Sequence, residues 1–168
     1  MSIETIDMVG AVAVGVGATF LLDLWTLFLR RAFDVRSLDY CVVGRWLGHM
    51  PAGTFRHDSI AAAPTRPGEC AIGWIAHYFT GVAFALLLVA PTSGRWLDQP
   101  TLPPALLVGI GTVLVPFLVM QPAFGLGIAA ARTPNPARAR LKSLMTHTVF
   151  GLALYAAAAL LNYARTPA

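Results

Sequence analysis

The sequence predicts an all-α fold: an integral membrane four-helix bundle with a short interfacial helix in its first cytoplasmic loop. Of the 168 residues, 57% are hydrophobic and only 12% are charged, whereas soluble domains carry about 25% charged residues. Four apolar stretches are each long enough to cross a bilayer, which takes roughly 20 residues in a helix. The strict polar–apolar alternation of a membrane β-barrel is absent from the sequence.

The four helices are expected at about residues 6–29, 70–90, 104–131 and 141–164, within one transmembrane domain covering residues 1–168. Acidic Glu4 and Asp7 precede the apolar core of the first helix, and this core is longer than that of a signal peptide, so we interpret the helix as an uncleaved anchor. The third is expected to be kinked, because Pro116 and Pro122 lie in its interior and each removes a backbone hydrogen bond.

The cytoplasmic loop over residues 30–69 is too long to be a simple turn. The sequence of this loop predicts a short helix over about residues 38–49, with Ser37 as the capping residue. The apolar face of this helix would lie flat at the membrane interface. Arg45 and Trp46 are interpreted as anchors of the helix at that interface.

Positive charge predicts the orientation in the membrane. Ten of the 12 Lys and Arg residues follow the first and third helices, six in one loop and four in the other. The positive-inside rule therefore places both loops in the cytoplasm and both termini outside the inner membrane. Cys41 and Cys70 would lie on the cytoplasmic side, where a reducing environment argues against a disulfide. The net charge of +4 is explained by this topology and by anionic lipid, without a nucleic-acid partner.

Small and polar residues recur at spacings of four along three of the predicted helices, so each set shares one helix face. The close-packing glycines of these faces would let another helix approach closely; they are Gly15, Gly73, Gly81 and Gly151. Counting depth along the helices then puts one polar side chain from each helix in a single intramembrane layer: Asp23, His77, Gln121 and His147. Polar groups at this depth are costly and rare, so this layer is the candidate site.

Other interpretations of the same residues stay open. Each histidine could make a single packing hydrogen bond, and Asp23 could pair at the interface with Arg30 or Arg31. The long loop offers a second candidate site, formed by His49, His57, Asp58 and Glu69. Histidines and carboxylates also suit a transition metal, although no compact metal motif, phosphate-binding loop, dinucleotide motif or nucleophile elbow is present. No cofactor is predicted.

Several strings carry a family resemblance: VGRWLGHMPAGTFRHDSIAAA from Val43, GECAIGWIAHY from Gly68, PFLVMQPAFGLG from Pro116, TPNP from Thr133 and RLKSLMTHTVFGLALY from Arg140. At these residues the chain resembles a bacterial membrane protein family, domain of unknown function 2938. The resemblance covers almost the whole chain. It implies a multi-pass protein of the bacterial inner membrane and carries over no activity, ligand or catalytic residue.

The polar layer on small-residue helix faces favours a small transporter or an ion- or proton-conducting protein embedded in the lipid bilayer. Because four helices rarely enclose a wide path, a homodimer fits this hypothesis. Two alternatives remain: a membrane assembly or scaffold protein without transport, and a metal-dependent membrane enzyme. No sequence feature indicates a substrate.

Overall fold

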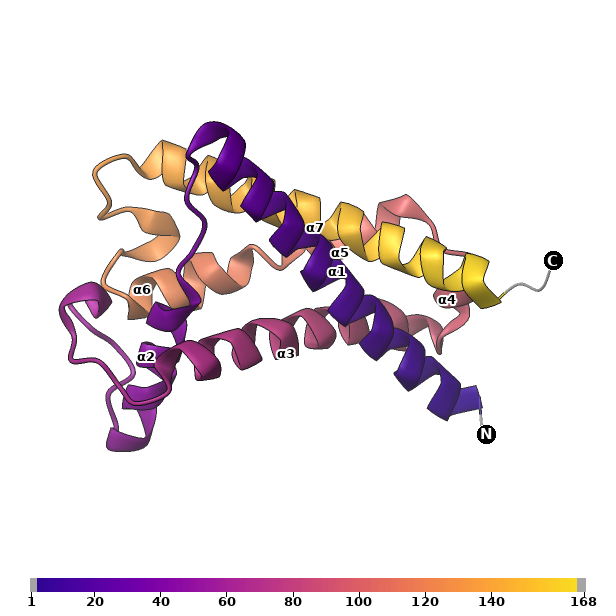
Figure 1. Cartoon of the computed structure of the whole chain (residues 1–168), viewed down its shortest axis with the longest axis horizontal. Helices are drawn as coiled ribbons and strands as arrows, with labels where there is room; N and C mark the ends of the chain where they lie inside the picture. The colour runs from indigo at the N-terminus through magenta and orange to yellow at the C-terminus, as the bar shows by residue number, and fades with distance from the viewer. Residues whose placement is uncertain (1–2, 166–168) are drawn as a thin grey trace. The chain divides into compact units, whose positions relative to one another are not determined.

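Four long apolar helices dominate the computed structural model, which describes residues 3–165, with side chains from residue 8 onward (Figure 1). The helices are α1 (Ile3–Phe33), α2 (Tyr40–His49), α3 (Glu69–Val89), α4 (Arg95–Asp98), α5 (Leu102–Gly111), α6 (Gln121–Ala123) and α7 (Pro136–Arg165). No strand occurs between residues 3 and 165. The predicted all-α class is confirmed.

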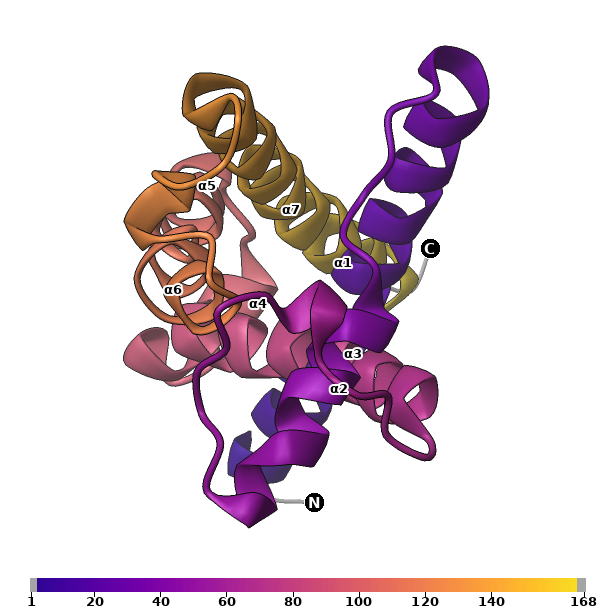
Figure 2. The same ribbon diagram turned by 90° about the vertical axis from the view of Figure 1, so that its left-hand side faces the viewer.

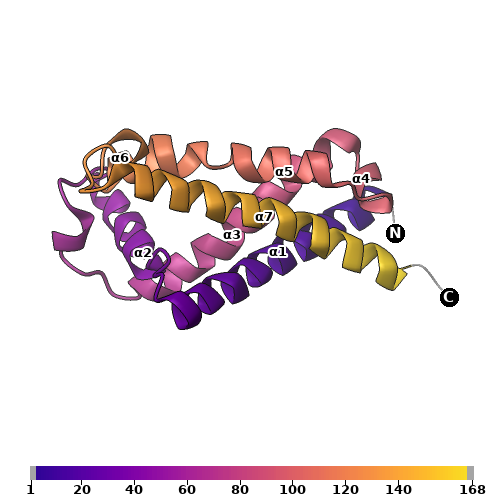
Figure 3. The same cartoon turned by 90° about the horizontal axis from the view of Figure 1, so that it is seen from above.

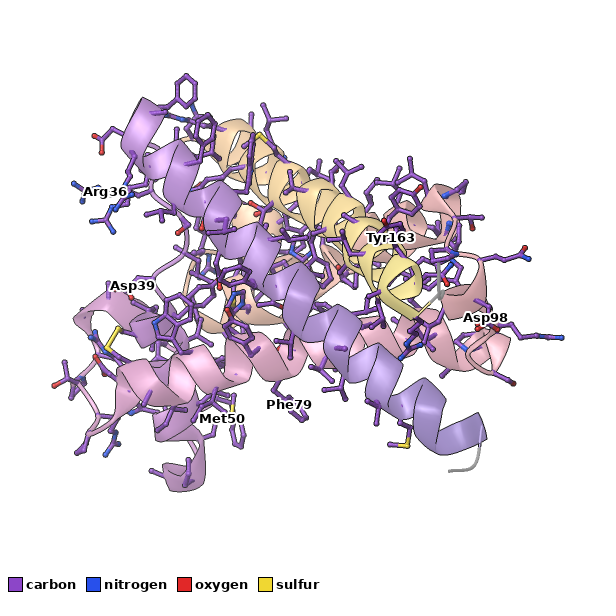
Figure 4. All side chains as sticks on the ribbon, turned by 45° about the vertical axis from the view of Figure 1, so that its right-hand side comes forward. Arg36, Asp39, Met50, Phe79, Asp98 and Tyr163 are labelled. Carbon is purple, nitrogen blue, oxygen red and sulfur yellow. A yellow bond between two sulfur atoms is a disulfide. The ribbon has the colours of Figure 1, made fainter. Side chains whose placement is uncertain are left out.

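Four segments have the length and apolar composition needed to cross a membrane: Met8–Phe33, Glu69–Thr92, Leu102–Ala123 and Pro136–Arg165. Large apolar side chains on these segments are exposed, including Phe79, which is 73% exposed (Figure 4), and Leu107, which is 75% exposed. Such outward faces would be unfavourable in water and are stable against acyl chains. The chain is therefore a multi-pass membrane protein in contact with the lipid bilayer.

The chain divides into two compact units. The first combines Met1–Ser37, Tyr78–Gly111 and Thr146–Ala168, and the second combines Leu38–His77 and Thr112–Met145. The first unit thus holds α1, α5 and most of α3 and α7. The second holds α2, the long loop and the interrupted end of the third span, with α6 (Figure 2).

The core of the first unit is built from small and branched apolar residues on all four long helices. Its buried members include Ala11, Val14, Ala18, Leu22, Ala85, Leu88, Ala105, Phe150, Leu154 and Ala158. Small side chains allow the helices to approach closely, which is the main source of packing energy where lipid removes the hydrophobic driving force. Where α1 crosses α7, a Cβ on Gly17 would lie 3.3 Å from the Cβ of Ala157 (Figure 3).

The third span is interrupted and is shorter than the sequence predicts. Helix α5 ends at Gly111, and Pro116 opens a π-helical turn, Pro116–Met120, because proline has no N–H to continue the regular ladder. The span ends at Ala123 instead of near residue 131. Beyond it the backbone turns through Gly125 and Gly127, whose φ angles of 87° and 76° end a right-handed helix.

The loop helix is present as α2, and it begins two residues later than expected. Asp39 is its capping residue instead of Ser37, because the Asp39 carboxylate accepts a hydrogen bond from the Cys41 amide at 2.9 Å. A short 3-10 turn follows α2 and ends at Gly53, whose φ of 78° is left-handed. Ser37 lies outside the helix.

Helix α2 packs against the beginning of α3, and its position at the membrane interface stays a prediction. The carbonyl of Tyr40 faces Gly73, and Gly44 faces the backbone of Glu69. A Cβ on Gly44 would lie 2.7 Å from the Gly73 nitrogen, closer than real contacts allow. Two glycines therefore bring the two backbones together.

Candidate functional site

Asp23 is the ionisable residue nearest the centre of the first span. It lies on α1 inside the segment Met8–Phe33, and its carboxylate accepts a hydrogen bond from the Tyr78 hydroxyl on α3 at 3.0 Å. Both side chains are half-buried. Tyr78 was not among the predicted site residues. The available signal was its position three residues before Gly81, which puts both on one face of α3.

A ladder of small residues positions this hydrogen bond. Going along α1, Gly15 meets Val82, Thr19 meets Gly81, and Asp23 meets Tyr78, so the two helices run antiparallel in contact. The buried Thr19 hydroxyl donates to the Gly15 carbonyl at 2.8 Å, which satisfies its polar atom within α1. The spacing of four that predicts the packing face of α1 thus also delivers Asp23 to α3.

His147 bonds to the end of a neighbouring helix. Its ring forms a hydrogen bond with the backbone of Gly109 on α5. Helix α5 ends two residues later, at Gly111, and the last carbonyls of a helix lack partners within it. Close packing makes the bond possible, because a Cβ on Gly109 would lie 2.6 Å from the Gly151 nitrogen. This geometry matches the interpretation of His147 as a packing residue.

His77 and Gln121 belong to the second unit. The His77 ring stacks on Tyr40, with centroids 3.9 Å apart and planes 22° apart. Gln121 is only 6% exposed, and its amide donates to the Ser143 hydroxyl at 3.3 Å. Its Oε1 is buried without a hydrogen-bond partner. An unpaired buried acceptor is costly, so Gln121 marks a polar point in an otherwise apolar span.

The four residues of the predicted layer are thus shared between the two units. Asp23 and His147 belong to the first unit, and His77 and Gln121 to the second. Each has a partner outside the quartet. Their convergence in one layer stays a prediction.

The loop histidines come together in the second unit. The rings of His49 and His57 meet edge to face, with centroids 5.0 Å apart. His49 Nε2 lies 2.9 Å from the Pro64 carbonyl, and its Nδ1 lies 3.2 Å from the Arg66 guanidinium. A carbonyl only accepts and a guanidinium only donates, so these contacts suit neutral His49 with its proton on Nε2.

His57 fastens the loop to the third span. Its backbone N–H donates to the Ala123 carbonyl at 2.8 Å. Burial is the main reason that the pKa of the His57 ring lies below its ordinary value of 6.5. The His57 Nε2 atom is buried without a partner. Asp58 contributes its backbone carbonyl, which faces Gly125.

Glu69 is held by arginine. The Arg45 guanidinium donates to both carboxylate oxygens, at 2.8 and 2.9 Å, and the Arg66 amide donates to the same carboxylate at 2.9 Å. The hydrogen bond with Glu69 is the main reason that the pKa of Arg45 is raised. Bidentate pairing fixes geometry as well as charge. Glu69 is therefore committed to the contact between α2 and α3.

Arg45 and Trp46 make contacts within the folded loop, and their expected role as interface anchors stays a prediction. Arg45 is engaged by Glu69 and lies 3.3 Å from the Ala61 carbonyl. The Trp46 indole N–H donates to the Phe55 carbonyl at 2.8 Å, and its ring meets Phe124 edge to face. Both side chains face the folded loop because the loop supplies carbonyl acceptors there.

A metal centre has no support among the residues that the structure describes. No group of three or more His, Cys, Asp or Glu side chains there lies in a position to hold a metal ion. Glu69, one of the candidate ligands, is occupied by Arg45.

The expectation of unpaired cysteines is contradicted. Cys41 and Cys70 form a disulfide that joins α2 to α3, with Cα atoms 3.9 Å apart; the yellow bond lies near the labelled Asp39 in Figure 4. The cysteines are 29 residues apart in sequence. Their proximity depends on how α2 packs, which local sequence patterns do not reveal.

The four candidate spans define a multi-pass membrane protein, and the Asp23 carboxylate lies within the first of them. The chain belongs to the family described as Protein of unknown function (DUF2938), whose model matches residues 12–161. This confirms the resemblance seen in the sequence. No curated protein and no solved structure gives a match.

Proposed function

We propose that the protein moves protons or small ions across the membrane, as a small transporter or conducting protein, with Asp23 as its titratable group. The hydrogen bond between Asp23 and Tyr78 inside two apolar spans carries this proposal. A carboxylate at the centre of a membrane helix costs about 2.5–3.5 kcal/mol on insertion scales. A hydrogen bond between membrane helices returns only about 0.6 kcal/mol on average. At that depth, packing alone would not offset the cost of Asp23.

The partner of the carboxylate suits proton exchange. A phenol hydroxyl can donate to a charged carboxylate and can accept from a protonated one. Tyr78 therefore keeps contact with Asp23 in both protonation states, at the observed separation of 3.0 Å. Asp23 would take up and release the proton or bind the ion, and Tyr78 would orient its carboxylate.

The contacts of the small-residue faces favour transport over a scaffold role. A scaffold would turn such faces towards lipid to receive a partner. Here Gly15 contacts α3, and Gly109 contacts Gly151 on α7, so these faces are occupied within the chain. We also propose the orientation that the charges predict, with the basic loops in the cytoplasm. We also propose a homodimer, because four helices rarely enclose a wide path.

Reconstituted vesicles provide the test. Proton entry driven by a potassium diffusion potential is followed with an enclosed pH dye, for wild type, Asp23→Asn and Tyr78→Phe. The Asp23→Asn variant keeps the shape and removes the titration, so proton flux should fall to the level of empty vesicles. Tyr78→Phe should reduce it less. Asp98→Asn, on the short helix α4 outside the spans, is the matched control. Wild-type flux equal to empty vesicles, or unchanged flux in Asp23→Asn, would end the proposal.

A further inference from the structure

The two cysteines occupy equivalent places in two helices. Cys41 is the second residue of α2, which begins at Tyr40, and Cys70 is the second residue of α3, which begins at Glu69. The first turn of a helix presents unpaired N–H groups and a positive dipole end. Thiolates are stabilised at such positions and next to cations, which makes the sulfur reactive. Each half of this disulfide is thus a good leaving group.

Backbone packing holds the cysteines together independently of their bond. Gly44 lies three residues after Cys41, and Gly73 lies three residues after Cys70, so each glycine shares a face with its cysteine. A Cβ on Gly44 would lie 2.7 Å from the Glu69 carbonyl carbon, and one on Gly73 would lie 2.6 Å from the Tyr40 carbonyl carbon.

The ion pair between Arg45 and Glu69 closes the same contact, with the Arg45 guanidinium 2.8 Å from a Glu69 carboxylate oxygen. Reduction of the disulfide breaks neither the glycine contacts nor the ion pair. The two thiols would stay at high effective concentration and could re-form the bond readily.

The two cysteine residues differ in exposure. Cys70 is exposed, whereas Cys41 is half-buried. Cys70 is also the second residue of the candidate span Glu69–Thr92, so it lies at one end of that span. Thiol–disulfide exchange requires access to one sulfur and a stable leaving thiolate at the other. The geometry assigns the first role to Cys70 and the second to Cys41.

We propose that Cys41 and Cys70 form a reversible redox site that exchanges two electrons with a dithiol. One thiolate of the dithiol attacks Cys70 Sγ, and Cys41 leaves as a thiolate. The second thiolate of the dithiol then attacks the dithiol's other sulfur, which is bonded to Cys70 Sγ in the mixed disulfide. Cys70 leaves as a thiolate. The protons of the dithiol pass to the two cysteines, so the dithiol becomes a disulfide and the protein gains two thiols. The reverse sequence oxidises the protein.

The test uses the full chain in lipid nanodiscs, with reduced and oxidised dithiothreitol as the reaction partner. Thiols are counted by the mobility shift from a maleimide polymer, and the count is unambiguous because the chain has only two cysteines. We expect two labels after reduction, none after re-oxidation, and the same result over repeated cycles. Labelling that requires unfolding the protein in detergent would show a permanent structural bond and overturn the proposal. Thiols that persist both in oxidised dithiothreitol and in the stronger oxidant oxidised glutathione would also overturn it.

Two variants test the assigned roles. Gly44→Ala should slow re-oxidation on the order of tenfold, because a shift of about 1 Å is enough to misalign reacting groups. Gly111→Ala is the control, since its Cβ would meet nothing within 4 Å. In Cys41→Ser the remaining Cys70 should form a mixed disulfide with oxidised glutathione. Unchanged re-oxidation in Gly44→Ala, or no adduct in Cys41→Ser, would contradict the assignment.

The redox state in cells is a further test. With the basic loops in the cytoplasm, the pair faces a reducing compartment. Cells quenched with acid should then yield two labels, and cells treated with a thiol oxidant before quenching should yield none. A pair that is fully oxidised in untreated cells would overturn the proposed reversible site.

Discussion

Replacing Gly15 by alanine tests how closely α1 and α3 must pack. The added Cβ would lie 2.5 Å from the Val82 Cα and 3.0 Å from the Gly81 carbonyl oxygen, both of them backbone atoms that no rotamer change can move. Carbon atoms pack at about 3.5–4.0 Å. Helices α1 and α3 must therefore separate by about 1 Å, or lose their contacts around Gly15.

The cost follows from the same geometry. Overpacking of this kind typically costs about 1–3 kcal/mol. The hydrogen bond between Asp23 and Tyr78, now 3.0 Å long, would stretch to about 4 Å and cease to be one, which adds about 0.6 kcal/mol. Alanine also favours helix over glycine by up to about 1 kcal/mol. Gly111→Ala makes the same replacement in a helix, and its new Cβ meets nothing within 4 Å. Comparing the two variants therefore cancels part of the gain in helix propensity.

We therefore expect Gly15→Ala to be about 2–4 kcal/mol less stable than Gly111→Ala. Reversible unfolding by dodecyl sulfate in mixed micelles, followed by circular dichroism, measures the free energy of unfolding for both. Equal stability of the two variants would refute the reasoning, because it would mean that α1 and α3 are not in backbone contact at Gly15.

Two further predictions concern the second unit. Gly125→Ala should lower the unfolding temperature more than Gly53→Ala does. Both glycines have left-handed φ angles, 87° and 78°, but only the Cβ on residue 125 would clash with a carbonyl, that of Asp58. Equal losses of unfolding temperature would contradict this contact. Burial lowers the pKa of His57 below 6.5 in the folded state, so the unfolded chain binds more protons at pH values just below 6.5. The stability of the fold should therefore fall as the pH is lowered through 6.5. The slope of unfolding temperature against pH should be smaller in His57→Gln, and an unchanged slope would contradict the role of His57.

The spans could be predicted from the sequence because length and hydropathy alone decide them. The end of the third span could not, since the string from Gly125 to Ala130 is as apolar as the helix before it. Its left-handed glycines at 125 and 127 appear only in the backbone. The cap of α2 was also ambiguous from sequence: Ser37 and Asp39 are both good capping residues, and the structure shows that Asp39 is the cap.

The candidate site was predictable on one helix at a time. Spacing of four placed Asp23 on the packing face of α1. Its partner Tyr78 was missed because a tyrosine in an apolar helix is usually interpreted as a residue that only packs against its neighbours. The disulfide between Cys41 and Cys70 was missed because compartment arguments say nothing about distance. Contacts across helices depend on which faces meet, and one sequence does not determine that.

Glycine has two separate uses in this chain, and they bear on the proposals differently. At Gly53 and Gly125 it permits a left-handed turn. At Gly15 and Gly44 it lets helix backbones touch. Asp23 follows Gly15 by eight residues on α1, and Cys41 precedes Gly44 by three residues on α2. Because helices are stiff over this length, the close contact sets the position of the neighbouring sulfur or carboxylate. Re-oxidation of the cysteine pair in Gly44→Ala is therefore a direct chemical measure of backbone approach.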